Sequence, residues 1–103
     1  MIQHLVLLKI RRDVPKKQVD ALFELLAGMK KVMPGLASFA GGPYSSPEGL
    51  HKGFTHGFAM TFENAQARDG YLTHPEHVKI KERVLAVLDG GLDGVVAFDF
   101  ESE

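Results

Sequence analysis

IQHLVLLKI, at residues 2–10, is the stretch that decides the fold. Aliphatic residues dominate it up to Arg11 and Arg12, which predicts a first β-strand. Side chains alternate along a strand, so the even-numbered residues share one face, while Leu5 and Leu7 lie on the other. Both faces are apolar, and such a strand needs cover on both sides of its sheet.

The clearest helix follows this strand. Pro15 suits a first helical turn, and Pro34 with Gly35 ends the pattern. Between them, apolar residues recur at helical spacing: Val19, Leu22, Phe23, Leu25, Leu26, Met29, Val32 and Met33. Further periodicities and turn formers predict strands at residues 36–41, 54–63 and 92–101, and helices at 64–73 and 75–89.

The predicted order is strand, helix, strand, strand, helix pair, strand. This is the order of a ferredoxin-like split βαβ fold of the α+β class, with a four-stranded antiparallel sheet and its helices on one face. The chain has 103 residues and no linker, so we expect one domain over residues 1–103.

The helices of such a fold cover only one face of the sheet. The other face would expose a continuous set of large apolar side chains, namely Leu5, Leu7, Val96, Phe98 and Phe100. The simplest cover is the same face of a second copy, related by a twofold axis. We therefore expect a homodimer, a dimeric α+β barrel.

Composition excludes several classes of partner. The chain is 45% hydrophobic and 24% charged with a net charge of -1, and its basic residues form only short pairs. This balance argues against binding to nucleic acid or to an anionic membrane. No cysteine is present, which fits a reducing, cytoplasmic setting, and no apolar run approaches a membrane span or a signal peptide.

YLTHPEH, at residues 71–77, places a phenol and two imidazoles where a proline opens a helix. Histidine exchanges protons near neutral pH, and a tyrosine hydroxyl can hold a developing oxyanion. We expect His77 to act as a general base, because the positive end of the helix favours its neutral form, and Tyr71 to bind the enolate oxygen. His74 is placed like an N-cap residue, a structural role.

Two more histidines are predicted to point under the helices. His4 shares a face with Val6 and Leu8, and His56 shares one with Phe58. They either form a structural hydrogen-bond network in the core or converge with Tyr71 and His77 on a pocket. Asp99 either orients one of these histidines or faces solvent at the end of its strand.

Three stretches resemble the stress-responsive dimeric α/β-barrel family, often called Dabb: residues 2–9, 52–62 and 68–77. The most specific part is the Tyr-x-x-His-Pro-x-His block, combined with a histidine in the first and third strands. The resemblance implies homodimers of ferredoxin-like subunits. In a plant polyketide cyclase of this family, the residues matching Tyr71 and His77 are catalytic, and those matching His4 and His56 lie in or beside the pocket.

The chain departs from that cyclase in the expected pocket lining, at Phe58, Met60 and Arg68, and it has no tryptophan. The substrate of the plant enzyme is therefore not implied, and an oxygenase site that depends on tryptophan is disfavoured. A metal site is also disfavoured, because the histidine pair at 74 and 77 lacks a clear third ligand. There is no phosphate-binding loop and no serine elbow.

The leading hypothesis is a pocket between sheet and helices that binds a small, largely apolar or carbonyl-containing ligand, without metal or cofactor. Tyr71 and His77 would transfer protons in cyclase-like or lyase-like chemistry. The expected binding residues are His4, Val6, Leu8, Leu22, Leu26, His56, Phe58, Met60, Arg68 and Asp99. The competing hypothesis is a non-catalytic, stress-responsive or ligand-binding protein whose histidines only hold the core together.

Residues 41–53 are dense in turn formers, with four glycines and two prolines. Few large apolar residues anchor this loop, so we expect it to be mobile and to act as the gate to the pocket.

Overall fold

The computed structural model describes residues 1–103 as one sheet with three helices packed on it. The elements are β1 (Ile2–Leu8), α1 (Lys16–Val32), β2 (Leu36–Pro43), β3 (His56–Phe62), α2 (Ala65–Thr73), α3 (Pro75–Val87), the short 3-10 helix η1 (Gly91–Gly94) and β4 (Val95–Glu101).

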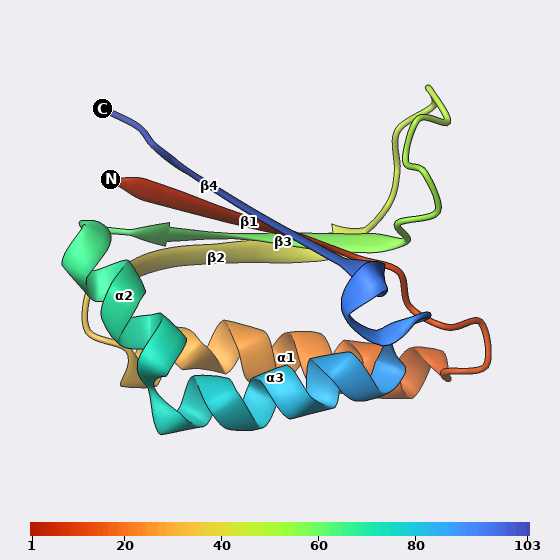
Figure 1. The fold of residues 1–103 in the computed structure, drawn as a ribbon, viewed down its shortest axis with the longest axis horizontal. Helices are drawn as coiled ribbons and strands as arrows, with labels where there is room; N and C mark the ends of the chain where they lie inside the picture. The colour runs from red at the N-terminus through yellow and green to blue at the C-terminus, as the bar shows by residue number, and fades with distance from the viewer.

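The sheet has the strand order β2-β3-β1-β4, and every neighbouring pair is antiparallel. Helices α1 and α3 lie side by side beneath one face, and α2 closes one end (Figure 1). This arrangement confirms the ferredoxin-like α+β fold expected from the order of the elements. The two ends of the chain meet, because Met1 and Ser102 exchange backbone hydrogen bonds of 2.7 Å.

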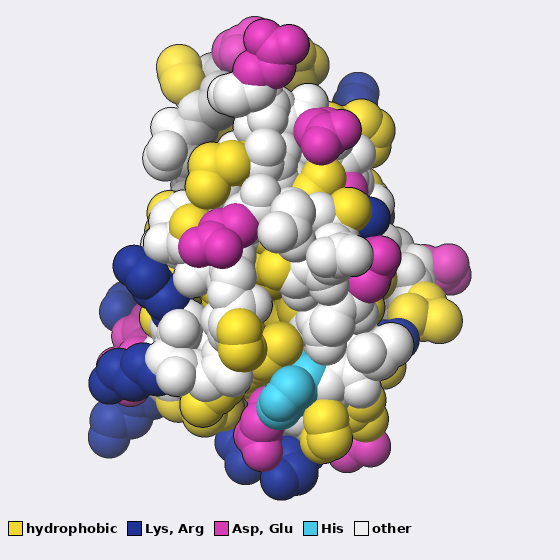
Figure 2. Space-filling model, turned by 90° about the vertical axis from the view of Figure 1, so that its left-hand side faces the viewer, with side chains coloured by type: hydrophobic (Ala, Val, Ile, Leu, Met, Phe, Trp, Pro, Cys, Tyr) yellow, Lys and Arg dark blue, Asp and Glu magenta, His cyan; other side chains and the backbone are white.

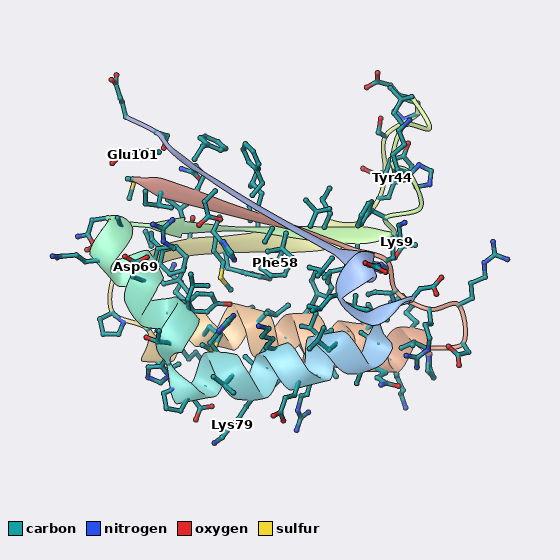
Figure 3. The ribbon with its side chains drawn as sticks, in the orientation of Figure 1. Lys9, Tyr44, Phe58, Asp69, Lys79 and Glu101 are labelled. Atoms are coloured by element: carbon teal, nitrogen blue, oxygen red, sulfur yellow. The ribbon has the colours of Figure 1, made fainter.

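The core lies between the sheet and the helices. Its buried side chains come mainly from β1, β3 and the apolar stripe of α1, with further ones from α2 and α3, and the most completely buried are Leu8, Leu26, Met60, Phe62 and Tyr71. Phe58 points from β3 into this layer (Figure 3). Gly41 permits this packing, because a Cβ there would lie 2.7 Å from the Cβ of Phe58 and 2.9 Å from the ring of Phe23.

The strand ends differ from the sequence prediction. β1 stops at Leu8 because the chain turns to bond with the segment after α3: Lys9 exchanges backbone bonds with Gly94 and Asp89, and Ile10 pairs with Leu88. Residues 91–94 form a 3-10 turn before β4, and β2 continues to Pro43. These ends depend on contacts between distant segments, which local periodicity does not encode.

The face of the sheet opposite the helices is uncovered, as the alternation predicted. Leu7 is 45% exposed, Phe98 61% and Phe100 44%. On this face Leu5 pairs with Phe98 across β1 and β4. The end of the molecule near both termini, in contrast, mixes acidic, basic and hydrophobic side chains (Figure 2).

The loop between β2 and β3 rises from the sheet on the uncovered side, away from the helices (Figure 1). It has contacts of its own: the rings of Tyr44 and His51 stack 3.9 Å apart, and the amide of Gly49 donates to the Tyr44 hydroxyl at 2.8 Å. Figure 3 shows Tyr44 on this projecting segment.

Candidate functional site

A cavity of about 270 Å³ lies between the sheet and α3. Twelve of its fifteen lining residues are hydrophobic, and the other three are His4, His77 and Lys81. The volume lies just under the range of pockets that hold drug-sized molecules, so the space suits a smaller ligand.

Two caps position the motif at residues 71–77. The Asn64 side chain accepts the amide of Ala67 at 2.8 Å and starts α2, which carries Tyr71 into the core. His74 Nδ1 accepts the amide of Glu76 at 3.1 Å and starts α3 at Pro75. The structural role predicted for His74 is confirmed. Because two helices meet at this cap, Tyr71 and His77 face each other across the corner.

Tyr71 is only 1% exposed, and its hydroxyl forms no hydrogen bond within the protein. Every fully buried side-chain nitrogen or oxygen has a partner, so this hydroxyl is open to the cavity that Tyr71 lines. Burial raises the pKa of Tyr71 to about 12. The phenol therefore stays neutral at physiological pH and can donate a hydrogen bond.

His77 stands next to Tyr71, with ring centroids 4.4 Å apart. Its Nδ1 donates to the carbonyl of Leu72 at 3.1 Å, which leaves Nε2 as the basic nitrogen of the neutral ring. Burial lowers the pKa of His77 below its ordinary value of 6.5; the bond to Leu72 opposes this, and the charges of Lys81 and His4 add to it. Neutral His77 thus prevails near pH 7.

His4 is held from behind by a carboxylate. Its Nδ1 lies 2.6 Å from Asp99 Oδ1, and Arg68 Nη1 donates to Asp99 Oδ2 at 2.9 Å. Burial alone would raise the pKa of Asp99, but the hydrogen bonds from His4 and Arg68 bring it below its ordinary value. Asp99 therefore orients His4 rather than facing solvent, and His4 Nε2 is left for the cavity.

Residues 2–102 match one family model, the stress responsive A/B barrel domain called Dabb. This chain belongs to the Dabb family. The stress-response A/B barrel domain-containing protein HS1 of Arabidopsis thaliana is 30% identical over 100 residues, which cover 97% of this chain and 88% of that protein.

Two other similar proteins are informative. Olivetolic acid cyclase of Cannabis sativa is 25% identical over 77 residues, 75% of this chain and 76% of the cyclase. A dimeric ferredoxin-like protein from Jannaschia sp. CCS1 is 29% identical, with a TM-score of 0.89 and 98% of each chain covered. These comparisons establish the family and its fold.

Not all residues expected in the pocket of this Dabb chain meet there. His4, Val6, Leu26, Phe58, Tyr71 and His77 line the cavity. Leu8, Leu22 and Met60 are buried in the core without lining it. Arg68 and Asp99 lie behind His4, so they act on the cavity only through that imidazole.

His56 does not converge with the other histidines, contrary to expectation. It pairs with Leu8, whereas His4 pairs with Met60, so four residues of strand, roughly 13 Å, separate the two along the sheet. His56 lines a different cavity of about 860 Å³, beside Phe23 and the start of α1, and its Nδ1 bonds to Thr55 Oγ1 at 2.8 Å. The β1–β3 register sets this separation, and the register cannot be predicted from the sequence of either strand alone.

The prediction that residues 41–53 gate the pocket is also wrong. None of residues 41–53 lines the cavity at His77. They border the cavities at His56 instead, so the loop cannot gate the Tyr71 site within one subunit.

The sequence did not predict that α3 and the 3-10 turn line the cavity. The additional lining residues are Leu72, Ile80, Lys81, Val84, Leu85, Leu88, Leu92, Val95 and Ala97. The signal was available in part: Ile80, Val84 and Leu88 recur at the spacing of one helical face, the face that also carries His77.

No group of three or more His, Cys, Asp or Glu residues is arranged to hold a metal ion. None of the helices is both long and apolar enough to cross a bilayer.

Proposed function

We propose that this Dabb protein binds a small, largely apolar carbonyl compound in the cavity and removes a proton from the carbon next to the carbonyl. His77 Nε2 takes the proton, and the Tyr71 hydroxyl donates to the oxygen that becomes an enolate. His4, held by Asp99, orients the ligand. The name of olivetolic acid cyclase, a relative over three quarters of this chain, supports cyclase-like chemistry.

One observation carries the proposal. Tyr71 is buried and His77 is half-buried beside it, with ring centroids only 4.4 Å apart, and neither the Tyr71 phenol nor Nε2 of His77 has a hydrogen-bond partner within the protein. A core that needed only stability would use apolar side chains, because an unsatisfied polar group loses its hydration. A neutral base beside a neutral donor is the pair that enolisation requires.

The protein is further proposed to act as a homodimer. The apolar face around Phe98 has no cover within the chain, and the Jannaschia relative is a dimeric protein. Both observations support face-to-face packing of two sheets about a twofold axis.

Proton abstraction is testable before the natural substrate is known. A small ketone such as 2-hexanone, in deuterated water, exchanges the protons next to its carbonyl, and NMR follows the loss of signal. We expect the protein to accelerate this exchange. General acid–base groups contribute about 100-fold or more, so His77→Ala should remove most of the acceleration, and Tyr71→Phe a large part of it.

His51→Ala is the matched control, because this imidazole stacks on Tyr44 in the loop, away from the cavity. It should exchange the ketone as the wild type does. An unaccelerated exchange in the wild type, or equal rates in His77→Ala, would refute the enzymatic proposal.

The alternative function is ligand binding without catalysis, with the polar residues serving stability. The Arg68–Asp99–His4 chain favours it, because its internal bonds at 2.6 Å and 2.9 Å are fully made without a ligand. Under this alternative, the ketone binds but its protons exchange no faster than in buffer.

A further inference from the structure

No acidic side chain lines the Tyr71 cavity, and Lys81 brings a positive charge to it. Its only lining residues with ionisable basic groups are His4, His77 and Lys81, and no carboxylate lines it. Asp99, the nearest acid in the network, has both oxygens engaged, one by His4 and one by Arg68. The cavity therefore offers an apolar body with hydrogen-bond donors and positive charge, and no acidic group to oppose an anion.

Lys81 is the distinctive member of this set. It follows His77 by one helical turn on α3, its side chain is exposed at the rim of the cavity, and no carboxylate lies within salt-bridge distance of it. Its charge reaches into the cavity, since it contributes to the lowered pKa of His77.

A second lysine on the same helix behaves differently. Lys79 bonds to Glu76 at 3.3 Å and is absent from the cavity lining. Figure 3 shows it projecting from α3 away from the sheet. The free ammonium at the rim is thus a property of position 81 and not of the whole helix surface.

We propose that the cavity selects an amphiphilic anion: a small carboxylate with an apolar tail, whose carboxylate lies at Lys81 and whose tail packs against Leu26, Phe58 and Leu88. An ionised carboxylate needs a partner when it leaves water, and the unpaired ammonium supplies one at the entrance. This inference rests on the proposed function, and it makes the substrate an oxo acid with its carbonyl near Tyr71 and its carboxylate at the rim.

Helix α3 packs on the covered face of the sheet, opposite the apolar face proposed for the dimer contact (Figure 1). Lys81 and the rim of the cavity therefore stay accessible in a face-to-face dimer. The gain from Lys81 is moderate, because exposed ion pairs are weakened by solvent and salt.

The test compares two probes of equal chain length, hexanoate and 1-hexanol. Each is titrated into the protein at low ionic strength, and binding is followed by NMR shifts of the Leu26, Ile80 and Leu88 methyl groups. Hexanoate should bind about three- to fivefold more tightly than hexanol, the range that exposed ion pairs provide. Lys81→Met should abolish that preference without weakening hexanol, and added salt should reduce it in the wild type.

Lys79→Met is the control for helix charge and should keep the preference for hexanoate. Equal affinities of the two probes in the wild type, or an undiminished preference in Lys81→Met, would overturn the inference. Ketone exchange that depends on His77, found together with equal affinities, would leave the proposed function standing and remove only the anion selectivity. If neither probe shifts the cavity methyl groups, both proposals fail.

Discussion

The two faces of the sheet have similar apolar side chains and very different surroundings. On the helix side, Phe62 is completely buried beside Tyr71, whereas on the other side Phe98 is 61% exposed. The ionisable groups are also divided unequally: His4, Asp99 and His77 belong to the covered layer. An apolar strand face therefore indicates that cover is needed, and polar groups inside the covered layer indicate where stability has been exchanged for a site.

The largest effect is expected on the covered face. Phe62→Ala should lower the free energy of unfolding by about 3–5 kcal/mol, because it leaves a cavity at a fully buried position. Denaturant titration at several protein concentrations measures this. A cost below about 0.5 kcal/mol, the range of surface changes, would mean that the covered layer is not the stabilising core.

On the uncovered face, the change should alter assembly first. Phe98→Asp places an unpaired charge in the proposed contact, so we expect sedimentation to show monomer where the wild type sediments as a dimer. Leu25→Asp, at a position 40% exposed on the helix side, is the control and should stay dimeric. A wild-type protein that is monomeric and well folded would show that the uncovered face needs no second copy to cover it.

The polar network of the covered layer should show an intermediate effect. Asp99→Asn weakens bonds to His4 and Arg68, so about 1–3 kcal/mol of unfolding free energy should be lost at neutral pH. Because the pKa of Asp99 is lowered in the folded protein, this stabilisation is present above its ordinary value of 3.8 and disappears as pH falls through the lowered value.

The difference between wild type and Asp99→Asn should therefore shrink on acidification, as thermal scans across the acid range would reveal. Asp93→Asn, at an exposed carboxylate in the 3-10 turn, serves as the control and should match the wild type. A difference that grows toward acid pH would contradict the assignment.

The smallest effect on stability is expected at Tyr71. Its hydroxyl has no protein partner, so Tyr71→Phe should change the free energy of unfolding by less than about 0.5 kcal/mol, while ketone exchange falls sharply. Thermal scans check the first part. A loss of several degrees would assign the hydroxyl to the structural network and favour the non-catalytic alternative.

Periodicity and turn formers were enough to predict the fold, the covered and uncovered faces, and the caps at Asn64 and His74. The cavity was predicted only in part. Tyr71 and His77 meet because α2 and α3 turn at His74, a local feature visible in the motif, and His4 joins them from the covered face of β1, as the strand alternation predicted. The separation of His56 from His4 depends on the β1–β3 register. Which residues of α3 line the cavity depends on the rotation of that helix about its axis where it packs on the sheet. Both features arise from contacts between distant segments.

The aromatic contact between Phe23 and Phe58 has one more consequence. Phe58 lines the Tyr71 cavity, and Phe23 lines the cavity at His56. The two rings are perpendicular, with 6.4 Å between their centroids, so this pair separates the two cavities. A large side chain between two cavities limits the length of the ligand that either one can hold. Shortening Phe58 should therefore connect the two cavities and admit longer ligands. Gly41 matters here because a Cβ at that position would clash with both Phe58 and Phe23 and displace the two rings.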